Sequence, residues 1–186
     1  VFKQADGATI AGAVLCTAGW YNNATSSGRP SGFADITVDG NEANCPSSTA
    51  SGVVMMNYWS TVSRLYVKNC PTDGIRLADQ NRAGVSISNS ASENRILECK
   101  VANVGRHAYY VQCTNNISNQ DGWLQDCLGS ETGGDFIKFD RISGWCVRRN
   151  HGYSIGANGI VGANAFASMV VENEIEQIGA NNEASA

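Results

Sequence analysis

The sequence lacks the features of a membrane protein and of a nucleic-acid-binding protein. It has no run of 18 apolar residues, so no membrane-spanning helix is expected. Lysine and arginine number 13 against 17 aspartates and glutamates, the net charge is −4, and no basic tract is present. A basic face is the electrostatic signature of nucleic-acid binding. Neither a membrane nor a nucleic acid is therefore expected as a partner.

Helical periodicity and closely spaced cysteines are also missing. No long segment repeats its apolar residues every 3.6 positions, which argues against helical bundles and helical solenoids. The 7 cysteines include no Cys-x-x-Cys pair, so no metal site of that kind is expected. Only 3 prolines accompany 20 glycines, which favours many tight turns between short strands.

What the sequence does contain is a repeat. Six short runs have the same shape, with an aliphatic residue three positions before the last residue and a polar residue or glycine one position before it. Their last residues are 29, 29, 28, 23 and 23 positions apart. A period in this range indicates a repeat architecture, in which each unit buries its apolar side against its neighbours. The six last residues are Asn41, Cys70, Cys99, Cys127, Asn150 and Asn173.

A second set of short strands lies between these runs. Units this short cannot form propeller blades, which need four strands and about 40 residues, and the spacing of leucine-rich repeats is missing. The remaining architecture is all-β, a parallel β-helix of about 6–7 coils in which like residues stack above like. The additional strands are expected at 52–56, 74–77, 108–111, 135–139 and 159–162.

The stacked cysteines are expected to be buried thiols. Neighbouring coils are about 4.8 Å apart, near the lower limit for the Cα atoms of a disulfide. A linear stack of Cys70, Cys99 and Cys127 cannot pair fully, so we expect these three to act as small hydrophobic residues. The pairing of the other four cysteines stays open.

One domain is expected over residues 1–186. It would comprise an irregular coil and loop at 1–32, regular coils at 33–179 and a small polar tail at 180–186. The chain starts at Val1 with residues typical of a strand and a turn, which favours a segment of a longer protein.

Several runs resemble a known family. The segments VDGN (38–41), VKNC (67–70), DGIRL (73–77) and LEC (97–99) are similar to coils of the right-handed parallel β-helix of the pectin-lyase-like superfamily. The resemblance covers roughly 33–179. The superfamily includes pectate and pectin lyases, polygalacturonase-type hydrolases, polysaccharide epimerases and phage tailspikes. It implies a polysaccharide partner and an extracellular, cell-surface or virion location. A homotrimer, common among tailspike-type members, stays open.

One segment resembles a catalytic motif. NHGYSIG (150–156) is similar to the Gly-His-Gly-x-Ser-Ile-Gly motif of polygalacturonases, although its first glycine is an asparagine here. GDFI (134–137) and TDGI (72–75) are similar to two further motifs of these hydrolases. Asp135 is followed by a phenylalanine where that family has a second aspartate, and no Arg-x-Lys follows His151.

Strand alternation predicts a substrate-binding stripe. In the second strand set, Arg76, Tyr110 and Lys138 each stand between two inward-facing residues, so all three are expected on one outer face on consecutive coils. The cations can pair with sugar carboxylates, and the ring can stack on a pyranose. The plain alternative is a row of ordinary solvated side chains.

Three residues are the predicted catalytic candidates. Glycoside hydrolysis uses two carboxylates about 5–5.5 Å or about 6.5–9.5 Å apart, and stacked coils can supply such distances. Asp135 and Asp140 flank one predicted strand, and His151, which titrates near neutral pH, follows in an adjacent coil. We expect the three to converge near one groove. Roles in turns are the alternative for each.

No metal and no cofactor are expected. A lyase would need a base, often with Ca²⁺, and Ca²⁺ prefers several converging oxygens; no dense aspartate cluster supports this, so Ca²⁺ is an open alternative only. The expected function is to act on or bind an extracellular, uronate-containing polysaccharide. Whether the protein is an enzyme stays open; if it is one, a polysaccharide lyase or a glycoside hydrolase is expected. The other function considered is a non-catalytic stalk or receptor-binding module of a tail fibre or surface protein.

Overall fold

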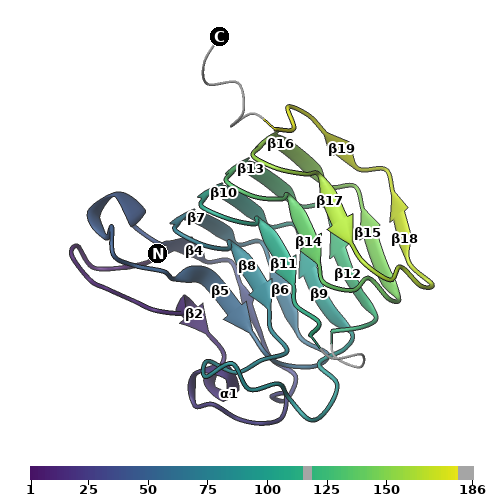
Figure 1. Ribbon diagram of the computed structural model, residues 1–186, viewed down its shortest axis with the longest axis horizontal. Coiled ribbons are helices and arrows are strands. Elements are labelled where there is room, and N and C mark those ends of the chain that lie inside the picture. Colours follow the sequence, from purple (N-terminus) through teal and green to yellow (C-terminus); the bar gives the residue numbers. More distant parts are fainter. Residues whose placement is uncertain (115–118, 180–186) are drawn as a thin grey trace.

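The computed structural model describes residues 1–114 and 119–179, which form a parallel β-helix (Figure 1). This confirms the predicted fold class. Sheet A contains β1 (Phe2–Lys3), β4 (Thr37–Asp39), β7 (Tyr66–Cys70), β10 (Lys100–Val104), β13 (Leu128–Thr132), β16 (His151–Ile155) and β19 (Glu174–Ile175). Sheet B contains β2 (Ala13–Cys16), β5 (Ser51–Met55), β8 (Ile75–Leu77), β11 (Tyr109–Val111), β14 (Ile137–Phe139) and β17 (Ile160–Gly162). Sheet C contains β3 (Gly32–Ala34), β6 (Thr61–Ser63), β9 (Asn94–Leu97), β12 (Gly122–Gln125), β15 (Trp145–Arg148) and β18 (Met169–Val171).

Each coil passes from sheet B to sheet C to sheet A, and all strand pairs are parallel. Two short helices, α1 (Ala18–Tyr21) and η1 (Glu42–Asn44), interrupt the first coils. No helix among the described residues is long and apolar enough to cross a membrane. The predicted tail at 180–186 lies outside the described residues.

The interior is built from columns of stacked side chains. In sheet C, Val62, Ile96, Leu124 and Val147 are in register and fully buried. The next member, Val170, is 48% exposed because it belongs to the last described strand of this sheet. Alternation therefore gives each strand one face in the core and one outside, and the outer face is where a ligand can bind.

Two glycines in sheet A make room for an aromatic ring. Gly129 and Gly152 occupy the inward column that valines occupy in β7 and β10. A Cβ atom would lie 2.5 Å from the Phe136 ring at Gly129 and 2.6 Å from it at Gly152. Phe136 packs edge-on against Tyr109, with ring centroids 5.8 Å apart. These coils thus use one large ring where others use β-branched residues.

The predicted six-member ladder is wrong in its first two members. Cys99, Cys127, Asn150 and Asn173 do stack, each immediately before its strand of sheet A. Side chains link the coils, because the Cys127 N–H donates to Asn150 Oδ1 and the Asn150 N–H donates to Asn173 Oδ1, both at 3.0 Å. In the preceding coil this position is held by Leu65.

An insertion explains the error. Cys70 ends β7 and is in register with Val104, so it belongs to the far end of sheet A. The 16 residues 78–93 separate β8 from β9 and lengthen this coil. A count of 29 residues from Cys70 therefore reaches Cys99 in a different part of the coil.

The expected buried thiols are confirmed for the three cysteines of that ladder. Cys70, Cys99 and Cys127 are free and buried. Only Cys99 and Cys127 are neighbours in one column. Burial raises the pKa of Cys70 to about 12, so this thiol stays protonated at neutral pH.

The 78–93 segment also limits the open part of sheet B. Its Ile87 and Ala91 form a second apolar cluster with Trp20 of α1 and with Val54. Val54 of β5 is the register partner of Arg76 in the preceding coil. It also faces outward from sheet B, but this cluster buries it. The outer face of sheet B is therefore polar only from β8 onward.

Candidate functional site

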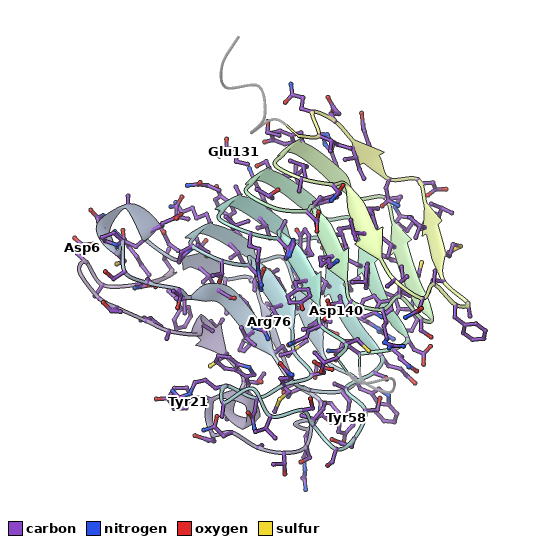
Figure 2. All side chains as sticks on the ribbon, in the orientation of Figure 1. Asp6, Tyr21, Tyr58, Arg76, Glu131 and Asp140 are labelled. Atoms are coloured by element: carbon purple, nitrogen blue, oxygen red, sulfur yellow. The ribbon has the colours of Figure 1, made fainter. Side chains whose placement is uncertain are left out.

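The predicted stripe is in register on sheet B. Arg76 pairs with Tyr110, and Tyr110 pairs with Lys138, at the middle of β8, β11 and β14. All three are half-buried, whereas their neighbours within each strand are buried. Alternation therefore directs these side chains outward, as the sequence predicts. Arg76 and Asp140 are labelled on this face in Figure 2.

The two cations of the stripe form no ion pair in the part of the chain that the structure describes. The Arg76 guanidinium donates to Gln112 Oε1 from Nε (3.2 Å) and Nη2 (2.5 Å). Gln112 in turn donates to Gln80 Oε1 (3.0 Å). Within residues 1–114 and 119–179, neither Arg76 nor Lys138 forms an ion pair. Burial lowers the pKa of Arg76, because a desolvated guanidinium is disfavoured.

Tyr110 is the centre of the stripe. Its ring lies 5.6 Å from Cζ of Arg76 and 5.1 Å from Cζ of Arg106. Its hydroxyl donates to Asp140 Oδ2 at 2.9 Å, an oxygen that also accepts the Cys113 N–H. Burial, together with the nearby Asp140 carboxylate, raises the pKa of Tyr110. Tyr110 is therefore a hydrogen-bond donor at neutral pH and not a base.

A column of polar side chains stands just before sheet B. Asp73, His107, Asp135 and Asn158 occupy equivalent positions, two residues before paired residues of β8, β11, β14 and β17. Each of the first three accepts the backbone N–H of the next coil, at Asp73 Oδ1 (3.4 Å), His107 Nδ1 (3.1 Å) and Asp135 Oδ1 (3.1 Å). The column thus provides acceptors for buried backbone N–H groups that would otherwise have no hydrogen-bond partner.

His107 is held as a neutral donor. Because Nδ1 accepts a backbone N–H, we assign the proton to Nε2. Burial lowers the pKa of His107, which favours the neutral ring although Asp135 Oδ2 lies 3.3 Å from Nδ1. The ring contacts Tyr110, with centroids 5.5 Å apart. His107 therefore belongs to the same surface as the stripe.

Arg106 forms an ion pair with a buried carboxylate, unlike Arg76. Its Nε donates to Asp73 Oδ1 (2.7 Å), and its Nη2 donates to Asp73 Oδ2. Asp73 is 0% exposed, so this fork neutralises a fully buried carboxylate. The hydrogen bond raises the pKa of Arg106. From the sequence, Arg106 was not singled out and His107, just before a predicted strand, had no evident partner, although extending the strand alignment upstream from Tyr109 would have placed both beside the stripe.

The expected convergence of the catalytic candidates is not found. Asp135 is 6% exposed, and its Oδ1 accepts bonds from Asn158 N and Nδ2 (3.1 and 2.8 Å). Asp140 follows the other end of β14 and binds Tyr110. His151 begins β16 in sheet A, and its Nε2 lies 3.0 Å from Glu176 Oε1. His151 therefore lies in sheet A, whereas Asp135 and Asp140 flank β14 of sheet B.

The described residues offer one group that could ligate a metal ion. His151, Glu174 and Glu176 each have a ligand atom within 4.8 Å of the others. The two glutamates are exposed, and His151 already contacts Glu176. This group lies on sheet A, away from the stripe.

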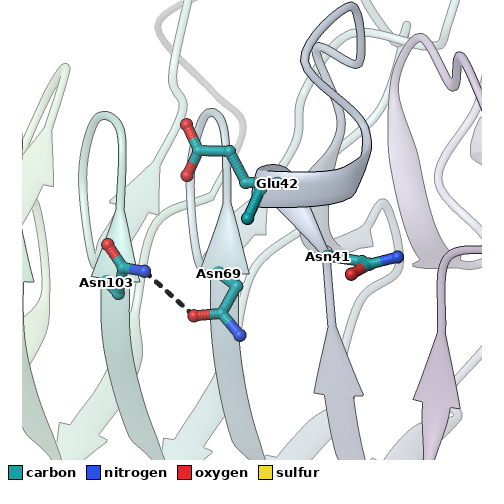
Figure 3. Close-up of a pocket in the computed structure, with 5 residues that line it drawn as sticks. Asn41, Glu42, Asn69 and Asn103 are labelled. Carbon is teal, nitrogen blue, oxygen red and sulfur yellow. Dashed lines mark hydrogen bonds between the residues drawn. The ribbon is translucent and has the colours of Figure 1, made fainter. Parts of the chain in front are cut away.

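A separate hollow lies at the end of sheet A nearest η1 (Figure 3). It has a volume of about 290 Å³ and is lined by Asn41, Glu42, Ala43, Asn69 and Asn103. Asn103 Nδ2 donates to Asn69 Oδ1 (2.9 Å), and Asn69 Nδ2 donates to Asp39 Oδ1 (3.0 Å). Both asparagines have φ of 53°, a conformation that asparagine tolerates. The two bonds form a chain from Asn103 through Asn69 to Asp39, which indicates a structural role.

Comparisons with known proteins find no relative. No family model, no curated protein and no solved structure matches this chain. The architecture defines the class, a parallel β-helix.

Proposed function

We propose that the protein binds an anionic, uronate-type polysaccharide along the outer face of sheet B. The observation that carries this proposal is the pair of half-buried cations, Arg76 and Lys138, which lie on either side of Tyr110 and form no ion pair among the described residues. Partial burial of a guanidinium that forms no ion pair is unfavourable, and an anionic ligand would relieve it. Such a role matches the glycan-binding members of the pectin-lyase-like superfamily, to which we assign the chain within this proposal.

The spacing of the groups suits a polymer. Arg76 and Lys138 are two strands apart, about 9.6 Å along the stack, with an aromatic ring between them. A sugar chain parallel to the helix axis would present carboxylates to the cations and a ring face to Tyr110. Arginine binds carboxylates through a planar fork. His107 Nε2 would add a donor for a hydroxyl group.

Cleavage of the bound chain is the second candidate. Asp140 is the carboxylate on this face that contacts the stripe, through Tyr110. Tyr110 and the Nε2–H of His107 are both donors at neutral pH, so neither is set up as a base. These protonation states favour binding over catalysis. A surface glycan as ligand would place the protein outside a cell or on a virion.

Affinity electrophoresis in gels containing polygalacturonate tests the proposal. We expect retardation of the wild type and about tenfold weaker binding for each of Arg76→Gln and Lys138→Gln. Lys100→Gln is the matched control, because Lys100 lies over the Tyr66 ring at 5.1 Å on sheet A. An unretarded wild type, or an equal loss in the Lys100 variant, would refute binding at sheet B. Assays of reducing ends and of unsaturated products decide whether cleavage also occurs, and Asp140→Asn should abolish it.

A further inference from the structure

The corner between sheets B and C has a left-handed residue in each of five successive coils. Each stands two residues before paired residues of sheet C. Four are acids, glycine or alanine, but the first is a tryptophan. They are Trp59 (φ 48°), Glu93 (59°), Asp121 (51°), Gly144 (69°) and Ala167 (47°).

The corner has a left-handed residue in every one of these coils, but nothing in the fold requires that residue to be a tryptophan. A bulky side chain is disfavoured in the left-handed region, and Trp59 is 64% exposed, so little burial offsets the strain. Strained residues of this kind cluster at binding sites. The conformation is fixed by neighbours, since Trp59 N–H donates to Ser92 O (3.0 Å) and Asn94 Nδ2 donates to Asn57 O (2.7 Å). These bonds fix the backbone of the corner, and the Trp59 ring, which meets the Tyr58 ring edge-on with centroids 5.7 Å apart, stays exposed.

A hollow opens beside the ring. It has a volume of about 390 Å³ and is lined by Trp59, Thr61, Glu93 and Arg95. Arg95 is in register with Thr61 and with Trp123 of the next coil, and its Cζ lies 4.8 Å from the Trp123 ring. Among the described residues, Glu93 and Arg95 form no ion pair with each other. The hollow therefore combines a ring face, a carboxylate, a guanidinium and a hydroxyl.

We infer that this hollow binds an uncharged pyranose residue. The Trp59 face can stack on the apolar C–H face of a sugar ring. Glu93 accepts a bond from a sugar hydroxyl, and Arg95 donates one to a sugar oxygen. One carboxylate and one guanidinium leave the hollow without a net charge that would favour a charged sugar, so the expected ligand is neutral. This site is separate from sheet B and does not depend on the function proposed there.

Titration of the full chain with neutral hexose oligosaccharides tests the inference. Cellohexaose, maltohexaose, laminarihexaose and mannohexaose serve as probes, with calorimetry and tryptophan fluorescence as readouts. We expect binding of at least one, weakened about tenfold or more by Trp59→Asn. Asparagine tolerates the left-handed conformation, so this variant should keep its fold. Glu93→Gln and Arg95→Gln should each weaken the same binding.

Phe166→Asn is the matched control, because Phe166 is also an exposed aromatic residue (73%) between sheets B and C. It should bind as the wild type does. The inference is overturned if none of the four oligosaccharides binds, or if Trp59→Asn leaves binding unchanged. It is also overturned if Trp59→Asn weakens binding of polygalacturonate alone. The first two results leave the sheet B proposal untouched, because that proposal depends on Arg76 and Lys138.

Discussion

Sheets A and B both carry cations and tyrosines on their outer faces, but the cations of the two sheets differ in their ion pairs and burial. On sheet A, Lys68 lies 3.6 Å from Asp39 Oδ2. At the turn into sheet A, Arg149 forms a fork with Asp126 (both distances 2.7 Å). On sheet B, the Arg76 guanidinium donates to the Gln112 amide oxygen and lies over the Tyr110 ring, and neither Arg76 nor Lys138 forms an ion pair among the described residues. Lys100 of sheet A, which lies over the Tyr66 ring, also forms no ion pair among the described residues, but it is exposed, whereas Arg76 and Lys138 are half-buried. Half-burial of a cation without an ion pair, and not residue type, therefore distinguishes the candidate binding surface.

The largest expected effect on stability comes from the Arg106–Asp73 ion pair beside the stripe. Arg106→Ala would leave the fully buried Asp73 carboxylate unpaired, which we expect to cost about 3–5 kcal/mol of unfolding free energy. Urea denaturation followed by circular dichroism measures this loss. The double variant Asp73→Asn, Arg106→Ala should recover part of it, because no buried charge remains. If Arg106→Ala is no less stable than the wild type, the Arg106–Asp73 pair is not structural.

Salt should separate the two proposed binding sites. Raising the ionic strength from about 0.01 M to about 0.15 M shortens the Debye length from about 30 Å to about 8 Å. Polygalacturonate affinity should fall about tenfold, because Arg76 and Lys138 act through charge. Binding of a neutral oligosaccharide at Trp59 should change little. Calorimetry at both ionic strengths measures each, and a salt-independent affinity for polygalacturonate would contradict the role of the two cations.

A smaller effect is expected from His107. Burial lowers its pKa below the usual 6.5, so below pH 6.5 the unfolded chain binds more protons than the folded chain. Stability should therefore be full above pH 6.5 and fall as the pH drops from there toward the lowered folded value. Urea midpoints at pH 5 and pH 7 measure the change. His107→Gln should flatten it, and an unaltered pH dependence in that variant would exclude His107 as its source.

The smallest effect should come from the exposed fork on the other side of the molecule. Arg149→Gln removes the contact with Asp126, whose side chain is 39% exposed, as Arg149 is 44% exposed. Exposed ion pairs contribute little, so we expect a small change in the urea midpoint and no change in polygalacturonate affinity. A loss of affinity as large as that of Lys138→Gln would end the distinction between the two surfaces.

Much of the fold and part of the candidate site followed from the sequence. The repeat and the absence of helical periodicity predicted a parallel β-helix, and strand alternation predicted the stripe of Arg76, Tyr110 and Lys138. Counting alone failed where the coil length changed. The 78–93 segment shifted Cys70 out of the column of Cys99. A fixed period cannot reveal such an insertion, because inserted residues need only close a loop.

The site was harder to predict because it depends on which coils are adjacent. His151 was grouped with Asp135 and Asp140 because it follows in an adjacent coil, yet the chain turns into sheet A before reaching it. Arg106 was not singled out and His107 had no evident partner, since Asp73 and Asp135 approach them only across neighbouring coils. Trp59 gave no signal because its left-handed backbone is visible only in the structure.

The sequence by itself determined the class of fold and the outward direction of the stripe, because both depend on local alternation and on repetition along one chain. The tertiary structure decided which charges are compensated. Arg76 and Arg106 are the same residue type on adjacent coils, yet one faces an amide and the other a buried carboxylate. That difference arises from stacking residues more than 30 positions apart, and it is what makes sheet B a candidate binding surface.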